Sequence, residues 1–597
     1  MDTLLLIVVC GGGFLVAYHT YGRFLARKIF KLDPKAYVPS HRLNDGVDYV
    51  PSKKGIIFGH HFTSIAGTGP IVGPAIGIIW GWLPAILWVM LGSIFMGAVH
   101  DFGSLVVSMR NDGKSISEVA AKYINPRVRF IFFIVVFFAL LIVIAIFGMV
   151  IAIVFHAFPS SVLPVWLQIP IAIGLGYAVY KKGASVLVST AVAVIAMYLC
   201  VFVGAMFPEA CTIGKIGGIP ATGVWTILLL IYAWIASTLS VTTLLQPRDY
   251  INAWQLFIMM GLLVVGTVVT SLNGTLELVA PAVRDTAGTD IPSIWPMMFV
   301  TIACGAISGF HSLVASGTSP KQISNESDVQ FIGYGSMLLE GFLAVLVIVC
   351  VGAGIGIAYQ VRGTGAELTG QVAWLEHYAS WEGATTGQKA TLNHEAMTGL
   401  EVKLNAVVVG AANILNGLGI SIIAGTTLMG VFIASFAGTT LDTTVRIQRY
   451  VVAELAGDLK ISFLTNRWAG TTFAVITAAA LAFATGVGGA GAMKLWPLFG
   501  TVNQLLASLA LLVITMYLKK KGGLKFIVTA IPCVIMLVIT CCAMTVNEQK
   551  FIMKAKSEIP ATSFEGWLLA IIGGGIFLLA IWMVVETVIV FFRRTTN

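Results

Sequence analysis

Long apolar runs separated by short polar segments make up almost the whole chain. The intervals 62–99, 130–180 and 405–441 contain no Asp, Glu, Lys or Arg. Each is longer than the roughly 20 apolar residues that one membrane-spanning helix needs, so the longest must fold back as helical hairpins. The two-residue alternation that is typical of membrane β-barrel strands is absent. The pattern therefore predicts an all-α polytopic membrane protein.

About fifteen transmembrane helices fit this pattern. Their approximate ranges are 3–24, 62–80, 83–108, 129–157, 162–180, 184–207, 223–246, 254–273, 293–316, 333–358, 418–438, 468–487, 495–518, 525–546 and 566–592. A polar segment at 360–403 separates the tenth helix from the eleventh. We interpret it as a solvated, flexible outer loop rather than a small cap or a partner surface.

Composition and charge agree with this interpretation. The chain is 57% hydrophobic and 11% charged, against roughly 25% charged in a soluble domain, and its mean hydropathy is +0.91. The net charge of +9 comes without a basic recognition motif, so we expect membrane lipid as a partner and no nucleic acid. With the N-terminus outside, most of the 36 Lys and Arg residues fall on one side, which the positive-inside rule makes cytoplasmic. The C-terminus is then cytoplasmic.

The second predicted helix contains a cluster of Gly and Pro, Ala66-Gly67-Thr68-Gly69-Pro70-Ile71-Val72-Gly73-Pro74-Ala75. Proline removes a backbone donor and glycine permits an unwound turn. Non-helical backbone at membrane depth survives only where it is packed in protein or lines a cavity. Free N–H groups at a restarted helix would favour an anion such as a carboxylate. The alternative is a proline kink with small-residue packing.

A hydroxyl-rich stretch, Tyr232 to Thr243, follows five helices later. In transporters built from inverted five-helix repeats, the first helix of each repeat is the broken one, and the two breaks meet at mid-membrane. We therefore expect the second break here. The predicted substrate-binding residues are Gly67, Thr68, Gly69, Pro70, Gly73, Ala236, Ser237, Thr238 and Ser240. Two further polar clusters, Cys304 to Lys321 and Ala434 to Thr444, would lie on the eighth and tenth helices of such a pair.

Ionisable residues within membrane helices default to functional hypotheses. Pairing of the second and third helices would place His60 and His61 beside His100 and Asp101 at the cytoplasmic end. Proton relay, structural hydrogen bonding and metal binding all remain open for this group, and coupling or packing for His311. The predicted ion-coupling residues are His60, His61, Asp101, His311, Ser312 and Ser316. The metal candidates are His60, His61, His100 and Asp101.

Other polar residues are assigned structural roles. We expect Asp442 to cap the following helix and Glu340 to lie at the membrane interface. The cysteines, Cys211 excepted, fall in apolar runs without a C-x-x-C pair, so we expect buried packing thiols. The absence of a P-loop and of hydrolase motifs indicates neither ATP-driven transport nor an enzyme, and no cofactor is expected.

Four strings resemble the CstA carbon-starvation family. They are Phe58 to Pro70, Leu245 to Tyr250, Ser308 to His311 with Thr318 to Lys321, and Asp442 to Arg446. The resemblance covers essentially the whole chain. It implies a LeuT-like core of five-plus-five inverted repeats, with extra helices at both ends, in the bacterial inner membrane. The implied organisation is an N-terminal helix and cytoplasmic loop at 1–60, the core at 61–445 and a four-helix extension at 446–597.

The resemblance also implies a secondary importer of peptides or of a small carboxylate such as pyruvate, used in nutrient starvation and coupled to protons. Sodium coupling is the alternative within the same core, through carbonyls near Ala66 and Gly69 with Ser312 or Ser316. A nutrient-binding sensor that does not transport is the alternative outside that class.

Overall fold

The computed structural model describes residues 2–286, 291–360, 367–379 and 399–593. The first half contains α1 (Asp2–Ala17), α2 (Pro39–Arg42), α3 (Lys54–Ile65), α4 (Gly69–Gly77), α5 (Trp82–Gly92), α6 (Ala98–Met109), α7 (Ile116–Tyr123), α8 (Pro126–Ala157), α9 (Val162–Gly176), α10 (Val186–Met206), α11 (Ala221–Thr238) and α12 (Leu245–Leu272). The second half contains α13 (Ile294–Thr301), α14 (Gly309–Gly317), α15 (Ser336–Gly352), β1 (Tyr359–Gln360), β2 (Glu367–Leu368), α16 (Gly370–Trp374), α19 (Gly399–Asn416), α20 (Ile422–Asp458), α21 (Arg467–Phe483), α22 (Gly491–Lys494), α23 (Trp496–Lys520), α24 (Ile527–Ala555) and α25 (Pro560–Phe592).

Twelve helices of the described residues are long and apolar enough to cross a membrane, or up to thirteen if one bent pair counts as a span. That pair joins Lys54–Ile65 to Gly69–Trp80 at an angle of 43°. The predicted helix 293–316 is divided into α13 and α14, and the predicted helix 468–487 has only the 17 residues of α21. The multi-pass helical class is confirmed, whereas the count of fifteen is not.

Two long helices form the middle of the molecule. In α8 the side chain of Asn125 accepts a hydrogen bond from the Val128 amide, and Pro126 occupies the first turn, where its missing donor costs nothing. This helix packs along α20, which has 37 residues. The predicted helix 418–438 is therefore too short, and Asp442, expected to cap the next helix, is wholly buried inside α20. Arg248 donates to the Asp442 carboxylate, so this carboxylate does not cap a helix, and α20 continues past it.

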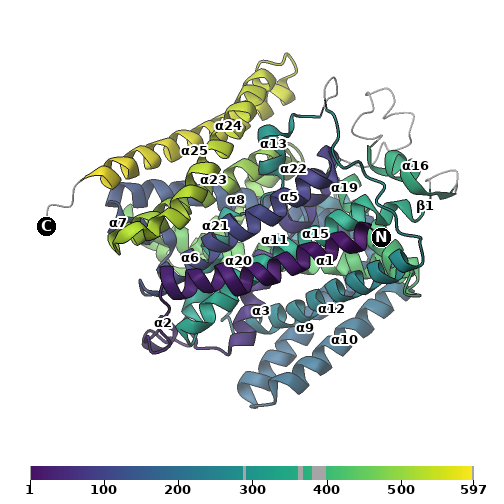
Figure 1. The fold of residues 1–597 in the computed structure, drawn as a ribbon, viewed down its shortest axis with the longest axis horizontal. Coiled ribbons are helices and arrows are strands. Elements are labelled where there is room, and N and C mark those ends of the chain that lie inside the picture. The colour runs from purple at the N-terminus through teal and green to yellow at the C-terminus, as the bar shows by residue number, and fades with distance from the viewer. Residues whose placement is uncertain (1, 287–290, 361–366, 380–398, 594–597) are drawn as a thin grey trace.

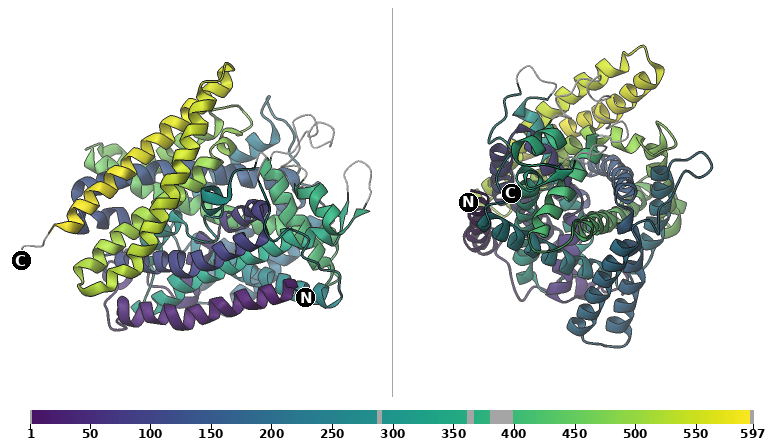
Figure 2. Two further views of the ribbon diagram at one scale, coloured as in Figure 1. Left: turned by 45° about the horizontal axis from the view of Figure 1, so that its top comes forward. Right: turned by 90° about the vertical axis from the view of Figure 1, so that its right-hand side faces the viewer.

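Two hairpins lie on opposite sides of this centre, α9 with α10 and α24 with α25 (Figures 1 and 2). They expose large apolar side chains such as Leu187 at 70% and Ile571 at 69%. A soluble protein would not leave such faces bare, whereas lipid solvates them. The start of α1 lies at the end of the molecule that carries α16 and β1, and α25 finishes at the opposite end (Figure 1).

Candidate functional site

Two helices are interrupted, and the interruptions touch. Residues 66–68 separate α3 from α4, and residues 302–308 separate α13 from α14. A Cβ atom added to Gly69 would overlap the Cys304 side chain, and one added to Gly73 would lie 2.8 Å from the Thr301 carbonyl oxygen. Glycine at these positions allows the start of α4 to lie directly against the second break.

Polar groups collect at the start of α4. The amides of Ile71 and Val72 donate to the Thr68 carbonyl oxygen at 3.1 and 2.8 Å. The hydroxyls of Ser64 and Thr68 are fully buried and have no hydrogen-bond partner within the described residues. Because a buried hydroxyl without a partner is costly, these two groups are available to a ligand.

The predicted span 223–246 is interrupted, since residues 239–244 between α11 and α12 are not helical, but this interruption is not the one that touches the first break. Helix α11 is continuous to Thr238, and the hydroxyls of Ser237 and Thr238 donate to carbonyls of their own helix. Arg446 donates to the carbonyl oxygens of Ala236 and Leu239, whereas Thr440 lies against Gly67. Six residues of α20 correspond to about 9 Å.

The segment 236–240 therefore lies at the end of α11, away from the start of α4. The hydroxyl of Ser240 hydrogen-bonds with Thr243 at 2.6 Å. The true partner of the first break is the segment 302–308, whose glycine and serine content was visible in the sequence. A count of five helices from the first break selects α11, whereas the segment that touches the first break belongs to a later part of the chain.

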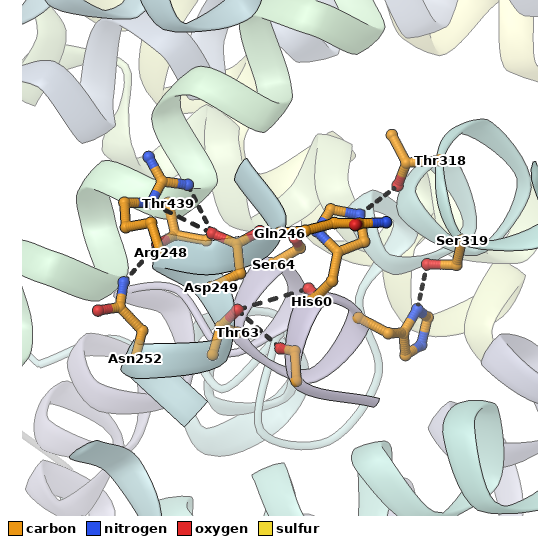
Figure 3. A network of polar contacts seen from close by, with 12 residues as sticks. His60, Thr63, Ser64, Gln246, Arg248, Asp249, Asn252, Thr318, Ser319 and Thr439 are labelled. Atoms are coloured by element: carbon orange, nitrogen blue, oxygen red, sulfur yellow. Dashed lines mark hydrogen bonds and ion pairs between the residues drawn. The ribbon is translucent and has the colours of Figure 1, made fainter. Parts of the chain in front are cut away.

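A buried charge network joins α3, α12 and α20 (Figure 3). His60 donates from Nδ1 to Asp249 Oδ2 at 2.6 Å, and its Nε2 is 3.3 Å from the Thr318 hydroxyl. Arg248 donates to Asp249 at 2.6 Å and to both carboxylate oxygens of Asp442. Two carboxylates thus face one guanidinium and one histidine.

The other histidines that the sequence singled out, His61, His100 and His311, belong to two further groups. His61 hydrogen-bonds with the Ser319 hydroxyl at 2.8 Å. Asp101 accepts from His100 at 2.8 Å and from His311 at 3.0 Å. The structure therefore brings together Asp101 and His311, as members of the predicted coupling set, but pairs His60 with Asp249 instead.

The remaining coupling candidates bond to backbone. Ser312 donates to the Gly309 carbonyl at 2.7 Å and Ser316 to the Ser312 carbonyl at 2.6 Å. Among the described residues, the group whose ligand atoms all lie within 4.8 Å is Cys304, His311 and Glu340, not the predicted metal set. Glu340, expected at the interface, is 0% exposed.

A cavity of about 350 Å³ lies among α7, α8, α14 and α20. Lys321 and Leu313 are among its lining residues, and the Lys321 ammonium is 4.2 Å from the Tyr450 ring centroid. Two smaller cavities follow one another from it. The first, about 10 Å³, shares Leu313 and reaches Phe499. The second, about 40 Å³, shares Phe499 and ends at Gly69 and Cys304. The three cavities are separate, but their shared lining residues place them in a row that ends at the two breaks.

The opposite end is covered by the segment of α16, residues 375–379 and α19, here named the cap. Trp374 and Tyr378 are 2% and 0% exposed, and the Tyr378 hydroxyl donates to the carbonyl oxygens of Ala75 and Ile76 in α4. The ammonium of Lys403 lies 3.6 Å from the Tyr378 ring centroid. These residues are helical and carry buried side chains, so they differ from the solvated loop that was expected. Residues 361–366 and 380–398 of the same predicted loop lie outside the described residues.

Comparisons with known proteins identify the family. The model of the carbon starvation protein CstA family matches residues 2–543. The chain belongs to this family. The resemblance found in the sequence is thereby confirmed.

Three curated relatives of the family show how far the similarity extends. A peptide transporter CstA of Campylobacter jejuni is 31% identical over 95% of the chain and 84% of its own length. In Escherichia coli, a peptide transporter CstA is 31% identical over 92% of the chain and 81% of its own length. The pyruvate/proton symporter BtsT of the same organism is 30% identical over 90% and 81%. These relatives are transporters.

Among solved structures, MhsT in complex with L-phenylalanine aligns at a TM-score of 0.43, with 11% identity, over 89% of this chain and 98% of that one. A manganese transporter of Eremococcus coleocola aligns at 0.42, with 10% identity, over 91% and 99%.

Proposed function

We propose that this protein is a proton-coupled secondary importer of peptides or of a pyruvate-like carboxylate across the bacterial inner membrane. The names of its relatives supply the substrate classes and the coupling ion. The observation that carries the proposal is the pair of touching helix breaks, with separate cavities on one side of them and the cap on the other. Unwound segments that meet inside a helical membrane protein are where transporters of this kind bind their substrates.

The substrate carboxylate would lie at the start of α4. Here the positive end of the helix dipole coincides with the unpartnered hydroxyls of Ser64 and Thr68. Both substrate classes carry a carboxylate, and the cavity at Gly69 and Cys304 adjoins this point.

His60 and Asp249 would carry the coupling proton. Both side chains are 0% exposed, and their 2.6 Å contact joins α3, which ends at the first break, to α12. Protonation of His60 would balance the network of two carboxylates and one guanidinium. The hydroxyls of Ser312 and Ser316, which the alternative sodium site would use, donate to backbone carbonyls and keep oxygen lone pairs, so the comparison of imposed gradients below decides between the two ions.

Uptake into proteoliposomes tests the proposal. Labelled pyruvate and a labelled dipeptide are offered under an imposed proton gradient or an imposed sodium gradient. We expect accumulation of one of them with the proton gradient alone. Gly69→Leu should reduce uptake to the level of empty liposomes, because the added side chain occupies the space of Cys304.

Gly261→Leu is the matched control, since nothing lies within 4 Å of a Cβ at this helical position. It should leave uptake unchanged. His60→Gln should retain substrate counterflow but lose accumulation driven by the proton gradient. Normal uptake by Gly69→Leu would overturn the substrate site, and proton-driven accumulation by His60→Gln would overturn the coupling assignment.

A further inference from the structure

Three potential metal ligands converge beside the second helix break. Cys304 lies in the break itself, His311 in α14 and Glu340 in α15. One ligand atom of each lies within 4.8 Å of the others, and His311 Nε2 is 3.4 Å from Glu340 Oε2. All three are buried, with exposed fractions of 5% for Cys304 and 0% for the other two.

The nitrogen and oxygen ligand atoms, unlike Cys304 Sγ, make no hydrogen bond in the part of the chain that the structure describes. Within the described residues, neither oxygen of Glu340 nor Nε2 of His311 has a hydrogen bond, and the approach of the two at 3.4 Å lacks hydrogen-bond geometry. A buried carboxylate without donors is costly, and a cation is the usual compensation.

The surrounding groups orient the histidine. Asp101 accepts the His311 Nδ1 proton at 3.0 Å and is held on its other oxygen by His100 at 2.8 Å. A carboxylate that fixes Nδ1–H leaves the Nε2 lone pair for a metal, which is the usual arrangement around metal-binding histidines. This lone pair faces Glu340.

Polar side chains surround the sulfur of Cys304. The Asn503 side-chain amide donates to Cys304 Sγ at 3.7 Å, and Sγ lies 3.5 Å from the Ser308 hydroxyl. Asn503 also accepts the Phe310 amide at 2.9 Å and so fixes the first turn of α14. The cavity of about 40 Å³ at Cys304 has space for a water molecule.

We propose that Cys304, His311 and Glu340 bind one divalent metal ion of the zinc class. One thiolate, one imidazole and one carboxylate are ligand types that Zn²⁺ takes, and three protein ligands plus water complete its tetrahedral coordination. The ion fastens the unwound segment 302–308 to α14 and α15. It thereby holds this break in position against Gly69. Asp101 is the positioning residue, acting through His311.

Metal analysis of the purified full-length protein tests this proposal without any transport measurement. We expect about one zinc per chain after purification without chelators. Cys304→Ser and Glu340→Gln should each abolish this content, and Asp101→Asn should weaken metal affinity about 10–100-fold. Cys350→Ser and Glu548→Gln are matched controls, since Cys350 is another buried cysteine and Glu548 another glutamate of a membrane helix. Both should retain the metal.

Cobalt gives a second measurement. Chelated protein titrated with Co²⁺ should develop a thiolate-to-cobalt absorption band that Cys304→Ser lacks and Cys350→Ser keeps. Each variant is used only if it elutes as a single species in detergent. A wild-type protein that contains no zinc and does not bind added Zn²⁺ or Co²⁺ would overturn the proposal, as would undiminished binding by Cys304→Ser and Glu340→Gln. Either result leaves the transport proposal standing.

Discussion

Asp48, in the loop between α2 and α3, is surrounded by cationic and hydroxyl groups. Its carboxylate lies 3.1 Å from Arg446 Nη1 and 3.8 Å from Arg449 Nη2, and accepts from the Tyr450 hydroxyl at 2.7 Å. Burial opposes ionisation, but the charges of Arg446 and Lys321 and the tyrosine hydrogen bond outweigh it, so the pKa of Asp48 is lowered. The carboxylate thus ties the loop to α20 beside the large cavity.

Replacement of Asp48 should therefore destabilise the protein in a pH-dependent way. Asp48→Asn is expected to cost about 1–3 kcal/mol of unfolding free energy at neutral pH. Because the folded-state pKa is lowered, this contribution is complete above the unfolded pKa of about 4 and is lost as pH falls through the folded pKa. Thermal unfolding in detergent across pH 3–8 measures it. The exposed Asp33→Asn should change little, and a deficit independent of pH would contradict the electrostatic origin.

Single residues also show why the partners of side chains could not be predicted from the sequence. From the sequence, His60 and His61 of α3 were expected beside His100 and Asp101. Their partners were inferred from neighbouring helices in the chain, whereas His60 bonds Asp249, 189 positions away. Such contacts depend on how distant helices pack, and no local spacing in a sequence encodes that.

At the scale of elements, α15 and α19 approach one another through glycine. A Cβ at Gly410 would overlap the Cys350 carbonyl oxygen, and one at Gly354 would overlap the Gly410 carbonyl. Asn413 donates to the carbonyl oxygens of Gly354 and Ala358 at 3.0 and 2.6 Å. Small residues that let backbones meet are typical of membrane helix pairs.

Gly410→Leu should separate these two elements. The expected loss of stability is about 1–3 kcal/mol, as for other overpacked sites. Gly174→Leu, where nothing lies within 4 Å of the added Cβ, should remain within about 0.5 kcal/mol of wild type. Thermal unfolding of both variants in one detergent makes the comparison, and equal stability would contradict close backbone packing at Gly410.

Helix α19 itself was missed by sequence analysis. Its first turns carry Glu401 and Lys403, and asparagine occurs further along, so hydropathy alone does not mark it as a membrane span. The structure buries Lys403 against the Tyr378 ring. A buried lysine of this kind is stabilised by an aromatic partner from another element, which the pattern of apolar residues could not indicate.

For the whole molecule, the multi-pass helical class could be predicted because apolar run length is set by bilayer thickness. The number of spans could not, since α13 and α14 are separate short helices within one apolar run. The pairing of the two breaks likewise depends on packing between distant segments.

The orientation predicted from charge can be tested at this scale. The background variant has serine in place of the partly exposed cysteines, which are Cys200, Cys211, Cys541 and Cys542. In this background, Glu367→Cys should react with a membrane-impermeant maleimide in intact cells. Lys460→Cys should react with the same reagent only after the cells are permeabilised. A membrane-permeant maleimide, which should label both cysteines in intact cells, serves as the labelling control. The reverse pattern would place the N-terminus inside.

The contact that holds the cap on α4 has a consequence for how the family can vary. The Tyr378 hydroxyl bonds carbonyl oxygens of Ala75 and Ile76, and every residue type carries such an oxygen. Positions 75 and 76 can therefore drift in evolution without releasing the cap, as long as α4 keeps its helical course. Loss of the Tyr378 hydroxyl, in contrast, would remove both of these hydrogen bonds at once.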